Sequence, residues 1–334
     1  MSCERHLGGE PAGCAPPGWL PGQGPDGLRD AVPADGSSQF GLSDHLRGKL
    51  HRGTAGGRQA LPQYSGVPGH PGPGWGWHGL AGRNVAELRF AAPTERRVAI
   101  VTGGARGIGR ACALRLAEAG RDVVIADVLP QAADVVREVE ALGQRALAVA
   151  TDVTDEAAVH GMVRRAHDEF GRLDILVCSA GILGLEAPFL EQSAAQFDRV
   201  LRINLYGVYF CHQAALPFML ANGWGRCVSL TSGARHGNPN QVPYCVSKAG
   251  VYTLVQSLGN AYPRQNVFVN GVEPGRALTD MVVPRFTPEF LANPGNAIGR
   301  YSDPEEVAEV VEFLCSERNT YVSGSVWSVK GGPG

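Results

Sequence analysis

The stretch RVAIVTGGARGIGRACALRLAEAG, residues 97–120, decides the fold of this chain. Its first part is a short, β-branched apolar run that ends in glycine, which is typical of a buried strand. The next part places Ile108, Cys112 and Leu116 four residues apart, as on one face of a helix. Gly120 then closes the predicted helix. A strand, a glycine-rich turn and a helix in this order indicate an α/β domain.

The same alternation continues to the end of the chain. Apolar runs predict further strands at residues 122–128, 146–153, 173–181, 226–232, 267–275 and 324–332. Periodic segments predict helices at residues 131–143, 155–171, 197–220, 243–262 and 304–316. Unbroken apolar strands are buried on both faces, and parallel strands are joined by right-handed crossovers. We therefore predict one α/β domain over residues 95–334, a doubly wound parallel sheet between two layers of helices.

Residues 1–94 differ in composition, because 20 of them are glycine and 11 are proline. Such a segment sustains neither a helical nor a strand period, so we expect a disordered extension. A binding arm is an alternative, since the segment carries three of the five Trp. A second alternative follows from the next methionine after Met1, which is Met162. In that case residues 1–84 are translated upstream sequence, and the protein starts at a non-Met codon such as that of Val85.

Charge and composition narrow the class of protein. The chain has 30 Lys and Arg against 32 Asp and Glu, so we expect neither a nucleic-acid nor a membrane partner. No apolar stretch of the sequence reaches the ~20 residues that span a bilayer, and the N-terminus lacks a secretory pattern. The eight Cys form no C-x-x-C pair and the nine His are dispersed. We therefore expect a cytoplasmic protein without a metal site.

The glycine-rich turn TGGARGIG, residues 102–109, indicates a dinucleotide site. Gly103 permits a tight turn, Gly107 lets the backbone approach a pyrophosphate, and Gly109 allows close packing of the helix. The start of the helix adds free N–H groups and the positive end of its dipole. The predicted cofactor contacts in this turn are Thr102, Gly103, Arg106, Gly107, Ile108 and Gly109.

Asp127 closes the second predicted strand, 24 residues after Gly103. A carboxylate there accepts hydrogen bonds from the adenosine ribose and repels a 2′-phosphate, which favours NAD over NADP. Arg106 is the counter-argument, because its guanidinium could pair with that phosphate, and NADP therefore stays open. Asp152 and Val153 close the third predicted strand and are expected to flank the adenine. A helix-capping role is the alternative for Asp152.

Five segments occur in the order and spacing of the short-chain dehydrogenase/reductase family: TGGARGIG, CSAG, INLYG, YCVSK and VNGVEPGRALTD. Residues 96–332 resemble this family, and its 3-oxoacyl-carrier-protein reductases share every motif. The resemblance implies a Rossmann-type fold and hydride exchange between NAD(H) and a small secondary alcohol or ketone. It also implies a homodimer or homotetramer, paired through helices 196–220 and 243–262.

Tyr244 and Lys248 lie four residues apart, so both project from one face of a predicted helix. An ammonium beside a phenol favours the phenolate and lowers a pKa that starts near ~10. Tyr244 would then be the general base for alcohol oxidation or the acid for carbonyl reduction. The resemblance implies that Lys248 also holds the nicotinamide ribose. It further implies that Asn204 connects Lys248 through water to a proton relay.

The substrate oxygen needs a second hydrogen bond beside Tyr244. The family uses a serine at the end of the fifth strand, and alignment of the strand ends picks Ser232, 12 residues before Tyr244. Most relatives have one residue more in this loop, so counting back from Tyr244 picks Thr231 instead. Neighbours in a strand point to opposite faces, so only one of the two faces the cleft. We assign Ser232 and keep Thr231 as the alternative.

The resemblance implies further positions at the cofactor: Ala180, Gly181, Pro274, Gly275, Ala277 and Thr279. Cys178 and Ser179 depart from the family, which usually has two Asn there that make buried hydrogen bonds. Residues 280–300 correspond to a substrate lid, and their apolar side chains indicate either a hydrophobic substrate or a lid packed on itself. His236 lies near Ser232, but the chain has no G-x-S-x-G elbow, which argues against a hydrolase.

Two other functions stay open at this point. One is an NADPH-dependent carbonyl reductase of the 3-oxoacyl type, which the affinities for NADH and NADPH would separate from the NAD-dependent enzyme. The other is a weakly catalytic, dinucleotide-binding regulatory protein. Only the shortened loop before Tyr244 and the CSAG segment support that second function.

Overall fold

The computed structural model describes residues 96–283 and 287–332. The predicted extension over residues 1–94 and the proposed start at Val85 lie outside the described residues. The described residues make up nearly all of the domain predicted over residues 95–334.

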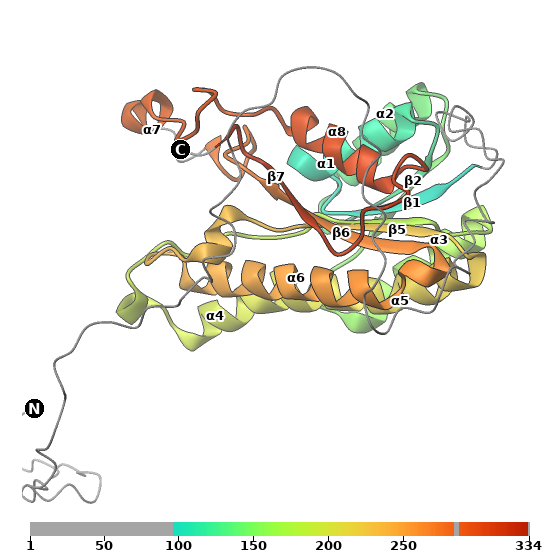
Figure 1. Ribbon diagram of the computed structural model, residues 1–334, viewed down its shortest axis with the longest axis horizontal. Helices are drawn as coiled ribbons and strands as arrows, with labels where there is room; N and C mark the ends of the chain where they lie inside the picture. The colour runs from blue at the N-terminus through green and yellow to red at the C-terminus, as the bar shows by residue number, and fades with distance from the viewer. Residues whose placement is uncertain (1–95, 284–286, 333–334) are drawn as a thin grey trace, which may run out of the picture. The chain divides into compact units, whose positions relative to one another are not determined.

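A seven-stranded parallel sheet forms the centre of the domain (Figure 1). Its strands are β1 (Val98–Thr102), β2 (Asp122–Asp127), β3 (Ala146–Ala150), β4 (Ile175–Cys178), β5 (Gly225–Leu230), β6 (Val267–Pro274) and β7 (Val326–Val329). The strand order is β3-β2-β1-β4-β5-β6-β7, and each neighbouring pair is parallel. The predicted doubly wound sheet is confirmed. The order reverses between β1 and β4, and ligands of such sheets bind beyond the carboxyl ends of the strands at this point.

Helices cover both faces of the sheet (Figure 1). Helices α1 (Gly107–Glu118), α2 (Ala132–Ala141) and α8 (Pro304–Cys315) pack on one face. Helices α3 (Glu156–Phe170), α5 (Gly207–Asn222) and α6 (Val242–Ala261) pack on the other. Each face has its own buried apolar cluster, with Leu116 in the first and Met162 in the second. Burying one such side chain stabilises the fold by about 1.5–3 kcal/mol.

The predicted single helix over residues 197–220 is wrong in detail. The structure has α4 (Ala194–Leu201), one π-helical turn over Arg202–Tyr206, and then α5. A capping box between Ser193 and Gln196 starts α4. The π turn coincides with Asn204, whose side chain binds a neighbouring loop, and such turns occur often at functional sites. The 3.6-residue apolar period cannot reveal one extra residue in a turn.

Shorter elements complete the domain. These are the 3-10 turns Phe189–Glu191, Gly233–His236 and Pro263–Gln265, together with the short helix α7 (Pro288–Ala292). Among the described residues, none of the helices has the length and apolar character required to cross a membrane. The same residues contain no group of three or more His, Cys, Asp or Glu side chains placed to hold a metal ion.

Candidate active site

The glycine turn between β1 and α1 is shaped for close contact with a ligand. A Cβ on Gly109 would lie 2.0 Å from the carbonyl oxygen of Gly103, so only glycine fits there. Gly107 has a φ of +54°, in the left-handed region that glycine adopts without strain. Within the described residues no side chain caps the N-terminus of α1, because Arg106 at the cap position makes no such bond. The first N–H groups of α1 therefore fit a dinucleotide phosphate.

Asp127 lies at the carboxyl end of β2, as expected, and is almost fully buried. Its Oδ2 accepts a 3.0 Å hydrogen bond from the backbone N–H of Ala105, and its Oδ1 accepts one of 3.0 Å from Leu129. The carboxylate thus holds the glycine turn against β2. Arg106 is exposed, and its Nη1 lies 3.8 Å from Oδ2 of Asp280. Its guanidinium therefore has an acidic neighbour at the start of the lid.

The loop after β3 differs from the expectation. The predicted strand over residues 146–153 ends at Ala150. Asp152 is exposed and its Oδ1 accepts hydrogen bonds from the N–H and the hydroxyl of Thr154, while Val153 is buried. Helix α3 is capped by Asp155, so Asp152 shapes a turn and caps no helix.

The loop after β4 lies against the glycine turn. A Cβ on Gly103 would lie 2.7 Å from Cα of Ala180, and the N–H of Ala180 donates to Oγ1 of Thr102 at 3.4 Å. The next residue, Gly181, lies close to the predicted catalytic groups. A Cβ there would be 3.2 Å from Oδ1 of Asn204 and 3.8 Å from Nζ of Lys248. The structure therefore brings the predicted phosphate turn and the predicted catalytic lysine to the same edge of the sheet.

Tyr244 and Lys248 lie on α6, one turn apart. Nζ of Lys248 is 5.7 Å from the centre of the Tyr244 ring and donates a 2.7 Å hydrogen bond to the carbonyl oxygen of Leu230, at the end of β5. Lys248 is buried, whereas Tyr244 is half-buried. Burial lowers the pKa of the Lys248 ammonium from 10.5 to about 8. The ammonium is therefore costly to the folded state at neutral pH.

The burial of Lys248 predicts a pH dependence of stability. Between the folded pKa of about 8 and the unfolded value of 10.5, the unfolded chain keeps a proton that the folded chain loses. The free-energy cost of burying the charged ammonium is present in full below pH 8 and is relieved as the pH rises. The free energy of unfolding therefore increases by about 3 kcal/mol between pH 8 and pH 10.5. Urea unfolding of Tyr244→Phe and of Tyr244→Phe/Lys248→Met at several pH values measures this. A difference between the two that stays constant with pH would contradict it.

Asn204 is fully buried in the π turn. Its Oδ1 accepts a 2.8 Å hydrogen bond from the N–H of Ile182, and its Nδ2 donates to the carbonyl oxygen of Ile182 at 2.8 Å. Nδ2 also donates to Oγ of Ser247 at 3.1 Å, a residue of α6 next to Lys248. Asn204 therefore joins the loop after β4 to the helix that carries Tyr244 and Lys248.

The two candidate hydroxyls after β5 have different surroundings. Oγ1 of Thr231 is buried and donates a 3.1 Å hydrogen bond to the carbonyl oxygen of Val272 in β6. Ser232 is half-buried and starts the turn Gly233–His236, where its Oγ accepts a 3.2 Å bond from the N–H of Ala234. The Thr231 hydroxyl thus already donates its proton to a hydrogen bond with β6. Ser232 is the acceptor in its bond with Ala234, so that bond leaves its proton available to a substrate.

Cys178 lies at the end of β4, buried beneath the site, and is the register partner of Ser229 in β5. A hydrogen bond from the Cys211 thiol lowers the pKa of Cys178, and the neighbouring His212 acts in the same direction, although burial opposes both. Cys178 therefore has polar partners where the family usually has an amide. Ser179 donates its N–H to the carbonyl oxygen of Thr102 at 3.2 Å, so the backbone pairing of this loop with β1 is retained.

The segment after β6 continues towards the glycine turn. Ala277 is buried and pairs with Ser302, and Thr279 lies against Gly107, where a Cβ would be 3.4 Å from its methyl group. Pro274 ends β6 and Gly275 packs against Lys330, which leaves no room for a side chain.

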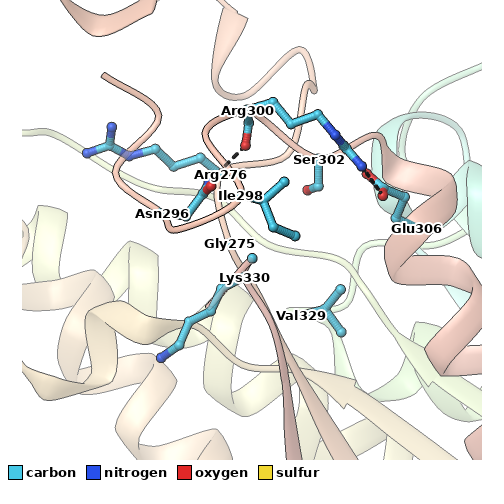
Figure 2. A pocket seen from close by; sticks show the side chains of 10 residues that line it. Gly275, Arg276, Asn296, Ile298, Arg300, Ser302, Glu306, Val329 and Lys330 are labelled. Carbon is cyan, nitrogen blue, oxygen red and sulfur yellow. Dashed lines mark hydrogen bonds and ion pairs between the residues drawn. The ribbon is translucent and has the colours of Figure 1, made fainter. Parts of the chain in front are cut away.

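A cavity of about 90 Å³ lies between Gly275, the end of β7 and residues 296–302 (Figure 2). On one side of it Arg300 pairs with Glu306 (Figure 2). In the lid, the ring of Phe290 stacks on Tyr301 with centroids 5.6 Å apart, and the Arg276 guanidinium covers it. Phe290 therefore packs against residues that flank the predicted lid on either side, whereas Val283 and Leu291 are about half exposed.

Some polar partners in this region have no motif of their own. Ser247 and Leu230 have no distinguishing feature in the sequence. Only the fold places the Ser247 hydroxyl beside Asn204 and the Leu230 carbonyl oxygen beside Lys248. Glu273 is different, because an acid inside the apolar strand VFVNGVEP is a detectable signal. Its carboxylate is fully buried and pairs with Arg235 and Lys330.

Comparison with known proteins finds relatives that are dehydrogenases or reductases. A family model described as enoyl-(acyl carrier protein) reductase matches residues 103–333. A cis-4-hydroxycyclohexanecarboxylate dehydrogenase of Sinomonas cyclohexanicum is 45% identical over 240 residues, which cover 71% of this chain and 96% of that protein. A short-chain dehydrogenase/reductase of Armillaria gallica is 35% identical, over 72% of this chain and 96% of that protein. The crystal structure of carveol dehydrogenase from Mycobacterium avium in complex with NAD superposes with a TM-score of 0.68 at 27% identity, over 72% of this chain and 98% of that one.

Proposed function

We propose that this chain, which belongs to the short-chain dehydrogenase/reductase family, uses Tyr244 to move a proton while NAD(H) exchanges a hydride with a secondary alcohol or ketone. The coarser part of this function follows from the family, since the chain is an NAD(P)-dependent oxidoreductase that acts on CH–OH groups. The roles of individual residues are the proposal.

One observation carries the proposal. Gly181 lies within 4 Å of both Asn204 and Lys248, counted from the position of its absent Cβ, and its neighbour Ala180 packs on Gly103. This continuous contact supports a single crevice between the phosphate turn and the helix of Tyr244. A bound nicotinamide would supply or take the hydride there.

Three residues of the chain are proposed to transfer the proton and to position the groups around it. Tyr244 takes the proton from the alcohol or returns it to the ketone oxygen. Lys248 stabilises the phenolate of Tyr244 and holds the nicotinamide ribose, and its low pKa results from the burial described above. Asn204 positions the loop after β4 and α6 relative to each other, and through water serves the proton relay.

Ser232 is proposed to donate the second hydrogen bond to the substrate oxygen, because the Thr231 hydroxyl already donates to Val272. Ser232→Ala should lower kcat by about 10²-fold, the usual loss of one such donor. The matched variant Thr231→Val should keep a kcat close to that of the wild type and lose about 1 kcal/mol of stability with its hydrogen bond. Steady-state kinetics and urea unfolding of both variants measure this. An inactive Thr231→Val beside an active Ser232→Ala would transfer the role to Thr231.

NAD is the proposed physiological cofactor, with NADP as the alternative. Support comes from Asp127, whose buried carboxylate lies at the end of β2 beside the glycine turn, where a 2′-phosphate would be repelled. Arg106, the residue that would favour the phosphate, has Asp280 as a neighbour. The alternative is an NADPH-dependent 3-oxoacyl reductase, because a 3-oxoacyl-[acyl-carrier-protein] reductase of Aquifex aeolicus is 37% identical to this chain over 243 residues.

The function is tested by titration and turnover. Fluorescence titration should give a lower Kd for NADH than for NADPH. The absorbance of the reduced cofactor should change with a panel that includes cis-4-hydroxycyclohexanecarboxylate, the compound in the name of the 45% identical relative. Preference for NADPH with turnover of a 3-oxoacyl thioester would establish the reductase instead. A bound cofactor without turnover of any alcohol or ketone would indicate a regulatory protein.

A homodimer or homotetramer in the cytoplasm is part of the proposal. Support for assembly comes from exposed aromatic and apolar side chains on α5, the π turn before it and α6, namely Tyr206, Tyr209 and Val246. Light scattering of the purified chain measures the mass of the assembly.

A further inference from the structure

A buried carboxylate joins three segments next to the candidate active site. Glu273, the last residue but one of β6, is fully buried. Its Oε2 lies 2.8 Å from Nη2 of Arg235, and its Oε1 accepts hydrogen bonds from Nζ of Lys330 at 3.0 Å and from Oγ of Ser328 at 3.2 Å. Arg235 belongs to the turn after β5, and Ser328 and Lys330 to β7 and its end.

Arg235 connects this cluster to the turn that begins at Ser232. The backbone N–H of Arg235 donates to the carbonyl oxygen of Ser232 at 3.1 Å, and a Cβ on Gly233 would be 3.6 Å from Oε1 of Glu273. The carboxylate therefore lies directly under the turn that begins at Ser232. The guanidinium of Arg235 also lies 4.3 Å from the ring centre of Tyr252, two helical turns beyond Tyr244 on α6.

Lys330 approaches the other oxygen of Glu273 from the end of β7. Lys330 is 43% exposed, and its ammonium points away from the cavity beside Gly275 (Figure 2). Both cations contact the same carboxylate, but only Arg235 is part of the turn that carries Ser232. Removing Lys330 leaves Glu273 paired with Arg235, whereas removing Arg235 takes away the ion pair between the turn and β6.

We propose that Arg235 and Glu273 are positioning residues, whose buried ion pair fixes the turn Gly233–His236 and thereby aims the Ser232 hydroxyl at the substrate. This inference rests on the proposed function, in which Ser232 holds the substrate oxygen. A buried carboxylate is costly unless it is paired, and its partners are held in fixed positions by that pairing. A planar guanidinium stacked on an aromatic ring has little freedom to move, so the turn is held at a defined height above β6. The same glutamate directly precedes Pro274, so the carboxylate that pairs with Arg235 adjoins the predicted cofactor residues Pro274 and Gly275.

Arg235→Met and Lys330→Met form a matched pair of tests, because each removes one cation from Glu273. Arg235→Met should lower kcat by about tenfold or more, since a catalytic group misplaced by about 1 Å can cost 10²-fold. Its Kd for NADH should stay near that of the wild type, and amide hydrogen exchange should accelerate at residues 233–238. Lys330→Met should leave kcat and the exchange of this segment unchanged. Arg235→Lys should recover part of kcat, because it keeps the charge but not the planar fork.

A double variant shows whether the two residues act through one contact. Glu273→Gln should lower kcat as Arg235→Met does, and Arg235→Met/Glu273→Gln should lose no more than Arg235→Met alone. Arg235→Met with normal kcat and normal exchange would overturn the proposal, as would an equal loss of kcat in Lys330→Met. If the wild type turns over no substrate, the proposed function fails. The exchange of residues 233–238 in Arg235→Met against Lys330→Met then decides whether the ion pair holds the turn.

Discussion

Tyr244→Phe is expected to lose about 10²–10⁴-fold in kcat, the range for removal of a general acid–base group. The replacement keeps the ring in its half-buried position on α6 and removes only the hydroxyl that is proposed to move the proton. Lys248 keeps its hydrogen bond to the Leu230 carbonyl oxygen, so the ribose contact should remain. The Kd for NADH should therefore stay close to the wild-type value. Stopped-flow or steady-state absorbance gives kcat, and fluorescence titration gives Kd.

Tyr252→Phe is the matched control on the same helix. Tyr252 lies eight residues after Tyr244, and its hydroxyl accepts a 3.3 Å hydrogen bond from the side chain of the exposed Gln256. The ring under Arg235 remains in Tyr252→Phe, so kcat should be that of the wild type. Retained turnover in Tyr244→Phe would remove Tyr244 from the proton transfer. Loss of turnover in both variants would point to a disturbed helix rather than to lost chemistry.

Gly109→Ala is expected to abolish cofactor binding at concentrations that saturate the wild type. The added Cβ would lie 2.0 Å from the carbonyl oxygen of Gly103, which is backbone and cannot rotate away. Either the glycine turn or the start of α1 must move by about 1 Å or more, and displacements of that size cost about 10²-fold. Because Gly103 also packs on Ala180, the loop after β4 should be disturbed as well. Isothermal titration with NADH measures the loss.

Gly161→Ala separates this effect from a general effect of alanine. Gly161 lies within α3 and has open space around its Cβ position. Alanine is favoured over glycine inside a helix by about 0.5–1 kcal/mol, so this variant should be more stable and should bind NADH normally. Normal NADH affinity in Gly109→Ala would show that the turn does not hold the cofactor.

Much of the fold was predictable because its signals are local. The apolar runs of β1, β2 and β4 need burial on both faces, and the glycine turn marks the join between β1 and α1. The π turn at Asn204 was not predictable from the local pattern, since the hydrogen bonds that accompany it join Asn204 to the distant Ile182. The early end of β3 at Ala150 is accompanied by a local signal instead, a turn that the side chain of Asp152 forms with Thr154 two residues later.

The candidate site also has parts that local sequence patterns predict and parts that depend on contacts with distant segments. Tyr244 and Lys248 are recognisable from their spacing on one helix, and Asp127 from its place at the end of a strand. The distinction between Ser232 and Thr231 depends on a bond to Val272 in another strand, 41 residues away from Thr231. The pairing of Arg235 with Glu273 likewise joins segments that no local pattern connects.

The hydrogen bonds of Asp127 have a consequence for attempts to re-engineer the chain. The carboxylate that we propose to discriminate against a 2′-phosphate also accepts hydrogen bonds from the N–H groups of Ala105 and Leu129 at the end of β2. A replacement that lacks an acceptor leaves the buried N–H of Ala105 without its partner, at about 1–3 kcal/mol, and also releases the part-buried N–H of Leu129. Cofactor preference is thus coupled to thermal stability in this chain. A successful switch to NADP therefore requires a second change that supplies new acceptors for Ala105 and Leu129.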